Sequence, residues 1–199
     1  RKKDLPILLD LDLGRGHLRS AARVGAGHDP LDLLVVGSGV AGLSAAVRAT
    51  SLHQMRVGVF PKGELEQSNT RWAQGGVAAV LGGDPDSTDL HLADTLAAGA
   101  GLCDVDAVRI LVEEGPRRVN ELIALGASFD RAEDGEFQLA REGGHSLPRI
   151  LHAGGAATGL EVERALVRAV RTSAAAIYES AFALDLMVQR DECVGIVGI

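Results

Sequence analysis

Three glycine-rich stretches of this sequence carry the residues best suited to chemistry. The first, Gly37-Ser38-Gly39-Val40-Ala41-Gly42, follows a short apolar run and precedes a helix-forming segment. In that setting the first glycine permits a tight turn, the second lets a phosphate approach the backbone, and the third lets helix and strand pack closely. The start of the helix would offer N–H groups and a partial positive charge to a pyrophosphate. We therefore predict a dinucleotide site here rather than a purely structural glycine turn.

The strand expected after this helix departs from the usual dinucleotide pattern. Such a strand normally ends near an Asp or Glu that holds a ribose hydroxyl, whereas Val57-Gly58-Val59-Phe60 leads into Pro61-Lys62. Lys62 cannot accept a hydrogen bond. It can donate to ribose oxygens, lie near a phosphate, or be a solvated loop lysine, and the residues alone leave these alternatives open.

The second stretch is Asn69-Thr70-Arg71-Trp72-Ala73-Gln74-Gly75-Gly76, and the third is Arg141-Glu142-Gly143-Gly144-His145-Ser146. With His152-Ala153-Gly154-Gly155, they resemble the flavoprotein family that contains the L-aspartate oxidases and the flavoprotein subunits of succinate dehydrogenase and fumarate reductase. The resemblance covers nearly all of residues 31–199. It implies that the second stretch wraps the flavin of FAD, where glycines allow close approach and backbone N–H groups can bond the isoalloxazine edge.

The resemblance also bears on how FAD is held. Succinate and fumarate enzymes typically carry a His that bonds covalently to FAD, five residues before the Gln of this stretch, where the present chain has Asn69. We therefore expect noncovalent FAD. A Lys at the position of Lys62 is usual in aspartate oxidases, which explains that departure. The predicted cofactor contacts are Gly37, Ser38, Gly39, Val40, Ala41, Gly42, Lys62, Asn69, Thr70, Arg71, Trp72, Ala73, Gln74, Gly75, Gly76 and Phe182.

Glu142 is the predicted catalytic residue. Succinate and fumarate enzymes typically show Phe-Gly-Gly-Gln-Ser where this chain has Glu142-Gly143-Gly144-His145-Ser146, the form found in aspartate oxidases. An amino-acid substrate brings an ammonium group that succinate lacks, and a carboxylate beside the flavin would be its partner. The alternative is a surface or N-cap carboxylate. His145 receives no catalytic role, since a His beside two glycines can simply bond the backbone.

The resemblance implies an FAD-dependent oxidoreductase. Such enzymes oxidise L-aspartate to iminoaspartate, pass a hydride to flavin N5 and reoxidise the flavin with oxygen or fumarate. The product feeds quinolinate and NAD synthesis, which suggests a functional link to quinolinate synthase. The family's Arg and His residues that bind the substrate carboxylates lie in segments that follow the position of Ile199, so we expect an N-terminal portion that is inactive alone. The alternatives are a succinate or fumarate oxidoreductase and a non-catalytic nucleotide-binding remnant.

The elements that must position these residues indicate an α/β fold of the Rossmann type, with a strand-helix-strand unit, inserted helices and a C-terminal antiparallel segment. We predict a disordered tail over residues 1–30 and an incomplete FAD-binding domain over 31–199.

The region 87–125 is expected to be helical, with Pro116 in the first turn of its last helix and Gly126 as the residue that ends it. Another helix is expected over 160–172, after Gly155-Ala156-Ala157-Thr158-Gly159, where the family often has Asp in place of Ala156 and where Thr158 can cap the helix. Residues 184–189 and 193–199 predict a hairpin.

Composition narrows the classes of function. A formal net charge of -7 and aromatics at 3% lack the basic, aromatic-rich pattern of nucleic-acid binding. The sequence offers no apolar run of the roughly 20 residues that a membrane span needs, so we expect a cytoplasmic protein. Cys103 and Cys193 stand apart without a ligand-spaced partner, which argues against a metal site and favours buried free thiols.

Overall fold

The computed structural model describes residues 7–10 and 31–199, which fall into two compact units. The first contains the described residues up to Asn69 together with Leu166–Ile199, and the second is Thr70–Ala165. Residues 7–10 differ from the predicted tail because they form strand β1 (Ile7–Asp10), while the rest of that prediction lies outside the described residues. Each unit is described by itself.

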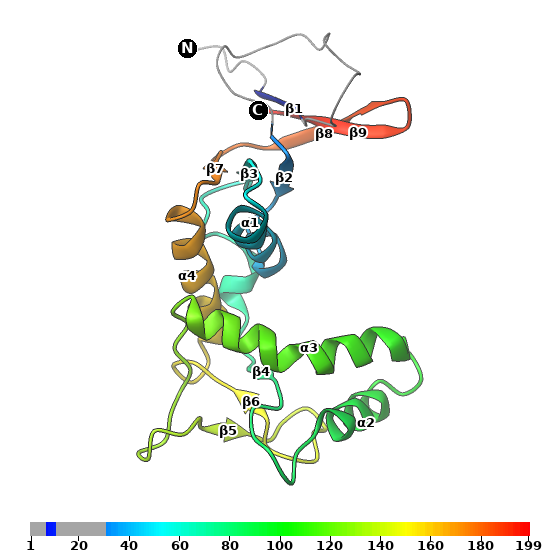
Figure 1. The fold of residues 1–199 in the computed structure, drawn as a ribbon, viewed down its shortest axis with the longest axis vertical. Coiled ribbons are helices and arrows are strands. Elements are labelled where there is room, and N and C mark those ends of the chain that lie inside the picture. Colours follow the sequence, from blue (N-terminus) through cyan, green and yellow to red (C-terminus); the bar gives the residue numbers. More distant parts are fainter. Residues whose placement is uncertain (1–6, 11–30) are drawn as a thin grey trace. The chain divides into compact units, whose positions relative to one another are not determined.

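A parallel sheet forms the centre of the first unit. Its strands are β2 (Leu33–Val36), β3 (Val57–Phe60) and β7 (Ala176–Ile177), in the order β2-β3-β7. Helix α1 (Val40–His53) connects β2 to β3 (Figure 1), which makes the predicted strand-helix-strand unit. All four residues of β3 are buried, as expected for the middle strand of a parallel sheet. The predicted α/β class is confirmed.

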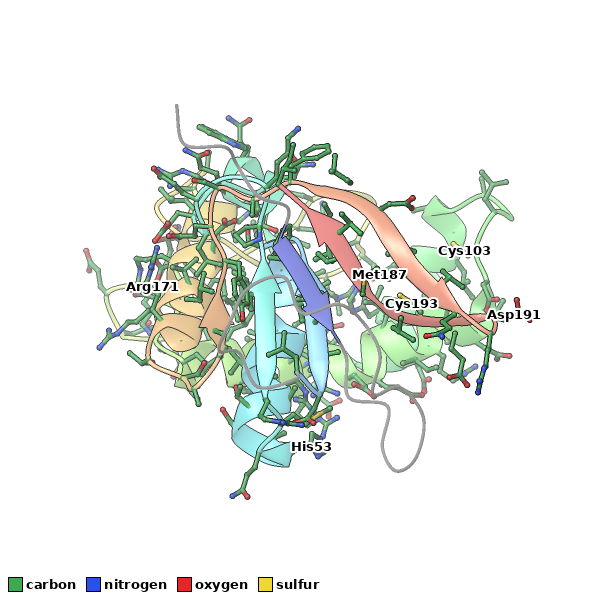
Figure 2. All side chains as sticks on the ribbon, turned by 90° about the horizontal axis from the view of Figure 1, so that it is seen from above. His53, Cys103, Arg171, Met187, Asp191 and Cys193 are labelled. Carbon is green, nitrogen blue, oxygen red and sulfur yellow. The ribbon has the colours of Figure 1, made fainter. Side chains whose placement is uncertain are left out.

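The chain's last strands form the predicted hairpin. Strands β8 (Ala183–Gln189) and β9 (Glu192–Gly198) pair antiparallel, and Figure 2 shows Asp191 at the turn between them. Strand β1 adds to the other edge of β9. Ile196 packs with Phe60 and Ala181 in a small buried cluster of this unit.

Two helices and a small antiparallel sheet make up most of the second unit. Helix α2 (Thr88–Ala98) packs on α3 (Val105–Ala124), and the sheet has the order β4 (Val77–Ala78), β6 (Ile150–Leu151), β5 (Leu139–Ala140). Pro116 lies inside α3, so the prediction that it opens a helix is wrong. The helix starts earlier because the Asp104 carboxylate accepts from the Ala107 N–H at 3.0 Å and caps it. Gly126, with φ +97°, follows the helix end as predicted.

Helix α4 (Thr158–Arg171) is the helix expected over residues 160–172, and its Val162, Ala165, Leu166 and Val170 are buried. Thr158 is its first residue rather than its cap, because the hydroxyl accepts from the Ala153 N–H at 3.2 Å. Within residues 7–10 and 31–199, the helices are too short or too polar to span a bilayer.

Candidate cofactor and substrate sites

The glycine turn after β2 has the geometry that its sequence predicts. Gly37 has φ +101°, a conformation that favours glycine, and its N–H donates to Phe60 O at 3.0 Å. A Cβ on Gly42 would lie 2.8 Å from Gly37 O and 3.0 Å from a Val35 methyl, so only glycine lets the helix pack this closely on the strand. Helix α1 starts directly after Gly39, with no acidic residue in its first turn to repel an anion. The backbone of residues 37–42 therefore fits a pyrophosphate.

The two predicted cofactor residues outside the glycine stretches meet in the first unit. The Lys62 Nζ lies 5.3 Å from the centre of the Phe182 ring, a distance at which a cation is attracted to the ring face. The loop that carries Lys62 is held in place, since Ser180 N–H donates to Gly63 O at 2.9 Å and Leu65 N–H donates to Glu179 at 2.8 Å.

Residues 69–76 form an open loop beside the start of α4. The short 3-10 helix η1 (Asn69–Trp72) opens it, and residues 72–75 are exposed. Ala73 O accepts from the Gly159 N–H at 3.0 Å, and a Cβ on Gly159 would lie 1.9 Å from Thr70 O. The helix start therefore holds this loop by a contact that requires glycine at 159.

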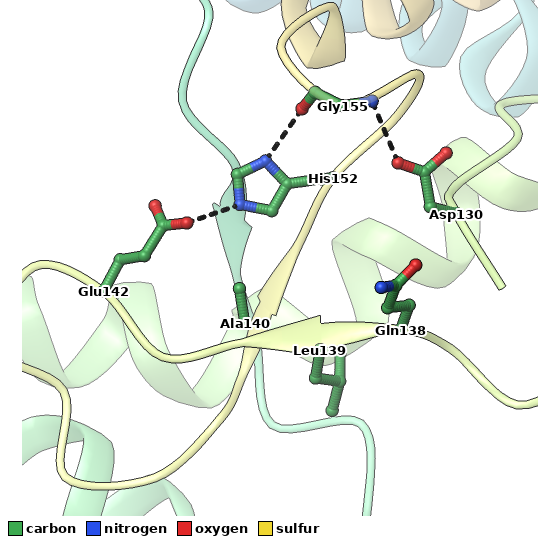
Figure 3. Close-up of a pocket in the computed structure, with 7 residues that line it drawn as sticks. All are labelled: Asp130, Gln138, Leu139, Ala140, Glu142, His152 and Gly155. Carbon is green, nitrogen blue, oxygen red and sulfur yellow. Dashed lines mark hydrogen bonds and ion pairs between the residues drawn. The ribbon is translucent and has the colours of Figure 1, made fainter. Parts of the chain in front are cut away.

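Glu142 lies in a pocket of the second unit with a volume of about 360 Å³ (Figure 3). The pocket is lined by Asp130, Gln138, Leu139, Ala140, Glu142, His152 and Gly155. The Glu142 side chain is 54% exposed, and its Oε1 lies 3.1 Å from His152 Nε2. The lining therefore combines two carboxylates, an amide and an imidazole, which can recognise a charged and hydrogen-bonding ligand.

Asp130 organises the far side of the pocket. Its carboxylate accepts from the N–H groups of Gly154 and Gly155 at 2.9 and 3.1 Å. The Gly155 carbonyl in turn lies 3.1 Å from His152 Nδ1, and a carbonyl can only accept, so Nδ1 carries a proton (Figure 3). Neither Asp130 nor His152 was predicted as a site residue.

A buried ionic cluster lies behind the loop that carries Glu142. The fully buried Arg149 donates through Nε and Nη2 to both oxygens of Asp86, at 2.9 and 2.6 Å, and through Nη1 to Asp94 at 2.6 Å. Asp94 also accepts from the backbone N–H and the hydroxyl of Ser146, both at 2.8 Å. Arg149 lies 2.9 Å from His145 Nδ1, which must therefore act as an acceptor. His145 and Ser146 of the predicted motif thus anchor the loop.

The cluster changes the ionisation of its members. The Ser146 backbone N–H and then Arg149 lower the pKa of Asp94 from 3.8 to about 2. The hydrogen bonds from Arg149 lower the pKa of Asp86, and those to Asp86 and Asp94 raise the pKa of Arg149. Burial lowers the pKa of His91, whose ring lies 5.0 Å from that of His145. The carboxylates therefore stay ionised at neutral pH.

The two cysteines do not match the prediction of buried thiols. Cys103 is partly buried and lies 3.8 Å from Thr95 O, whereas Cys193 is exposed on β9 (Figure 2). Both are free. The prediction is wrong for Cys193, because the first two residues of β9 are exposed.

Comparison with known proteins shows the family of the chain. A family model described as an FAD binding domain matches residues 32–199. An L-aspartate oxidase of Streptomyces coelicolor is 56% identical over 160 residues, which are 80% of this chain and 27% of that protein. A chloroplastic L-aspartate oxidase of Arabidopsis thaliana is 50% identical over 161 residues, 80% of this chain and 24% of that protein. The chain thus spans about a quarter of the length of these relatives.

Solved structures share the fold. A quinol fumarate reductase of E. coli superposes with a TM-score of 0.79 at 31% identity, over 85% of this chain and 29% of that one. The Mycobacterium smegmatis Sdh1 complex superposes with a TM-score of 0.77 at 31% identity, over 84% of this chain and 30% of that one.

Proposed function

The chain belongs to the family of FAD binding domains, and from that membership we propose that it is the FAD-binding segment of an enzyme that oxidises L-aspartate to iminoaspartate. The observation that carries the choice of substrate is the half-exposed Glu142 carboxylate in the pocket of the second unit. An α-ammonium group needs such an acceptor, whereas a dicarboxylate without an amine has no group that donates to it. The likeness to a fumarate reductase at 31% identity keeps that reaction as the alternative.

The residues present fit FAD held without a covalent bond. The turn at residues 37–42 offers its backbone to the pyrophosphate, and exposed Val36 and Val40 leave an apolar rim beside it. Lys62 and Phe182 lie in contact with each other and would contact a nucleotide on this unit. Residues 70–76, of which 72–75 are exposed, would contact the flavin, and Asn69 stands in place of a covalent His.

When bound, FAD accepts the two electrons that leave the substrate as hydride. The chain's own part would be to bind and orient the ammonium group. Glu142 would accept a hydrogen bond from it and so place the substrate carbon, and a charge-assisted bond of this kind is worth about 1.5 to 3 kcal/mol.

The same proposal includes reoxidation of the flavin by oxygen or fumarate, delivery of the product to NAD synthesis and a link to quinolinate synthase. A cytoplasmic location stays a prediction, since plant relatives are named chloroplastic.

A hybrid enzyme tests the proposal. Residues 31–199 would replace the matching segment of the Streptomyces coelicolor L-aspartate oxidase, and aspartate-dependent peroxide production and fumarate reduction would be measured. Glu142→Gln keeps the side-chain shape but removes the charge. We expect roughly ten- to 150-fold lower catalytic efficiency with aspartate and a much smaller change with fumarate. An aspartate-to-fumarate ratio that stays within about twofold, or ~0.4 kcal/mol, would contradict the ammonium contact.

A further inference from the structure

His152 stands between the pocket and the sheet of the second unit with both ring nitrogens in defined surroundings. Its side chain is 18% exposed, and Nε2 is buried. Nδ1 carries a proton because it faces the Gly155 carbonyl at 3.1 Å. Nε2 then faces Glu142 Oε1 at 3.1 Å, although the two are not aligned as a good hydrogen bond. Attraction between these two atoms requires a proton on Nε2 as well, because a carboxylate can only accept.

The ring cannot easily turn away from this position. Asp130 binds the N–H groups of Gly154 and Gly155, which fixes the carbonyl that Nδ1 needs, and Asp130 N–H also donates to His152 O at 2.8 Å. The ring follows directly after β6, whose pairing with β4 and β5 fixes the backbone. His152 is therefore held at its backbone and at Nδ1, with Nε2 directed at Glu142.

Gly76 leaves space for this ring. A Cβ on Gly76 would lie 2.9 Å from His152 Nε2 and 2.3 Å from an Ile150 methyl. Glycine at position 76 thus permits the close approach of the Ala-Gln-Gly-Gly stretch to the His152 ring, in addition to any contact with a cofactor.

We propose that His152 is the positioning residue of Glu142 and thereby a determinant of specificity for an amino-acid substrate. The inference rests on the proposed function, in which Glu142 binds the substrate ammonium. One carboxylate oxygen faces His152, and Figure 3 shows the other turned away from the ring. A half-exposed Glu loses rotamer freedom when it binds a ligand, and a partner that already restrains it removes part of that loss before binding. In this proposal His152 acts on the affinity for the substrate through the position of the Glu142 carboxylate.

Two variants of the hybrid enzyme distinguish the roles of the two ring nitrogens of His152. His152→Asn keeps an amide near the place of Nδ1, so it can still bond Gly155 O but cannot reach Glu142. His152→Gln places its amide near Nε2 and so can still restrain the carboxylate. We expect His152→Asn to raise the KM for L-aspartate roughly two- to tenfold while kcat and fumarate reduction stay within about twofold. His152→Gln should recover most of the lost affinity.

A double variant tests the dependence on Glu142. If His152 acts through that carboxylate, His152→Asn added to Glu142→Gln should raise the KM for aspartate no further. Additive losses would overturn the proposal, as would an unchanged KM in His152→Asn or an equal loss of aspartate oxidation and fumarate reduction, which indicates a structural role.

A measurement on the 199-residue chain separates this inference from the proposed function. In long-range ¹H–¹⁵N spectra of the histidine rings, Glu142→Gln should move the Nε2 signal of His152 and leave that of His91 in place. If the FAD-loaded hybrid fails to oxidise aspartate but the Nε2 signal still moves, L-aspartate is refuted as the substrate and the contact between Glu142 and His152 is supported. An unmoved His152 signal would refute the contact whatever the hybrid does.

Discussion

Replacing Arg149 by Met removes the cation that joins Asp86 and Asp94 while keeping much of the side chain's apolar volume. The wild-type guanidinium is fully buried and makes three charge-assisted hydrogen bonds, two to Asp86 and one to Asp94. Their carboxylates are only 12% and 16% exposed, so water replaces the lost partners poorly. Removal of one partner from a buried ion pair costs about 3 to 5 kcal/mol, and we expect a loss of this size in the free energy of unfolding.

Arg118 offers a matched control in the same unit. It also contacts two carboxylates, Glu114 and Glu121, but its side chain is 36% exposed on α3. An exposed ion pair contributes about 0 to 1 kcal/mol, so Arg118→Met should change little. Urea unfolding followed by far-UV circular dichroism measures both variants. If Arg149→Met loses no more stability than Arg118→Met, the buried cluster does not stabilise the fold as argued.

Three further predictions concern acid stability, the cofactor and turnover. The pKa of Asp94 in the folded chain is about 2 against 3.8 unperturbed, so its contribution to stability is fully present above pH 3.8 and is lost as the pH falls towards 2; the acid limb of an unfolding titration should flatten in Asp94→Asn. Because Asn69 replaces the covalent His, acid precipitation of FAD-loaded protein should leave the flavin in the supernatant, and fluorescence that stays on the denatured band would show a covalent link. The 199 residues alone should produce no peroxide from aspartate even when loaded with FAD, because Glu142 by itself supplies no group for the substrate carboxylates; measurable turnover would reverse that view.

Local patterns predicted the elements that hold the nucleotide turn. The place of β2, the bounds of β3 and the packing role of Gly42 follow from neighbouring residues. The spacing of apolar residues and the geometry of glycine both act within a few positions. The same local rules failed at Pro116. A proline at a first turn is the commoner case, but the cap at Asp104 starts the helix earlier, and the helix continues through the proline without its N–H.

The residues that hold Glu142 could not be found in this way. Arg149 is 63 positions from Asp86 and 55 from Asp94, and an Arg with two distant Asp residues has no spacing that marks a pair. His152 stood inside a motif that carried the resemblance, yet its neighbours in sequence do not show that its ring meets Glu142. Contacts between residues this far apart in sequence form only when β4, β5 and β6 have paired.

The arrangement explains why a flexible stretch can hold a charged group in one place. Gly143 and Gly144 have φ of +64° and +86°, so the backbone after Glu142 turns in a way that glycine allows without strain but does not by itself enforce. Contacts on both sides of the turn fix it: Ser146 donates to the partly buried Asp94, and Glu142 faces the restrained His152. A buried ionic cluster costs desolvation that an apolar core would avoid, and its partners here are the residues that anchor this loop. Replacing Asp86, Asp94 and Arg149 together by apolar residues should therefore retain stability while releasing Glu142. Such a variant would separate the positioning of the carboxylate from the stability of the fold.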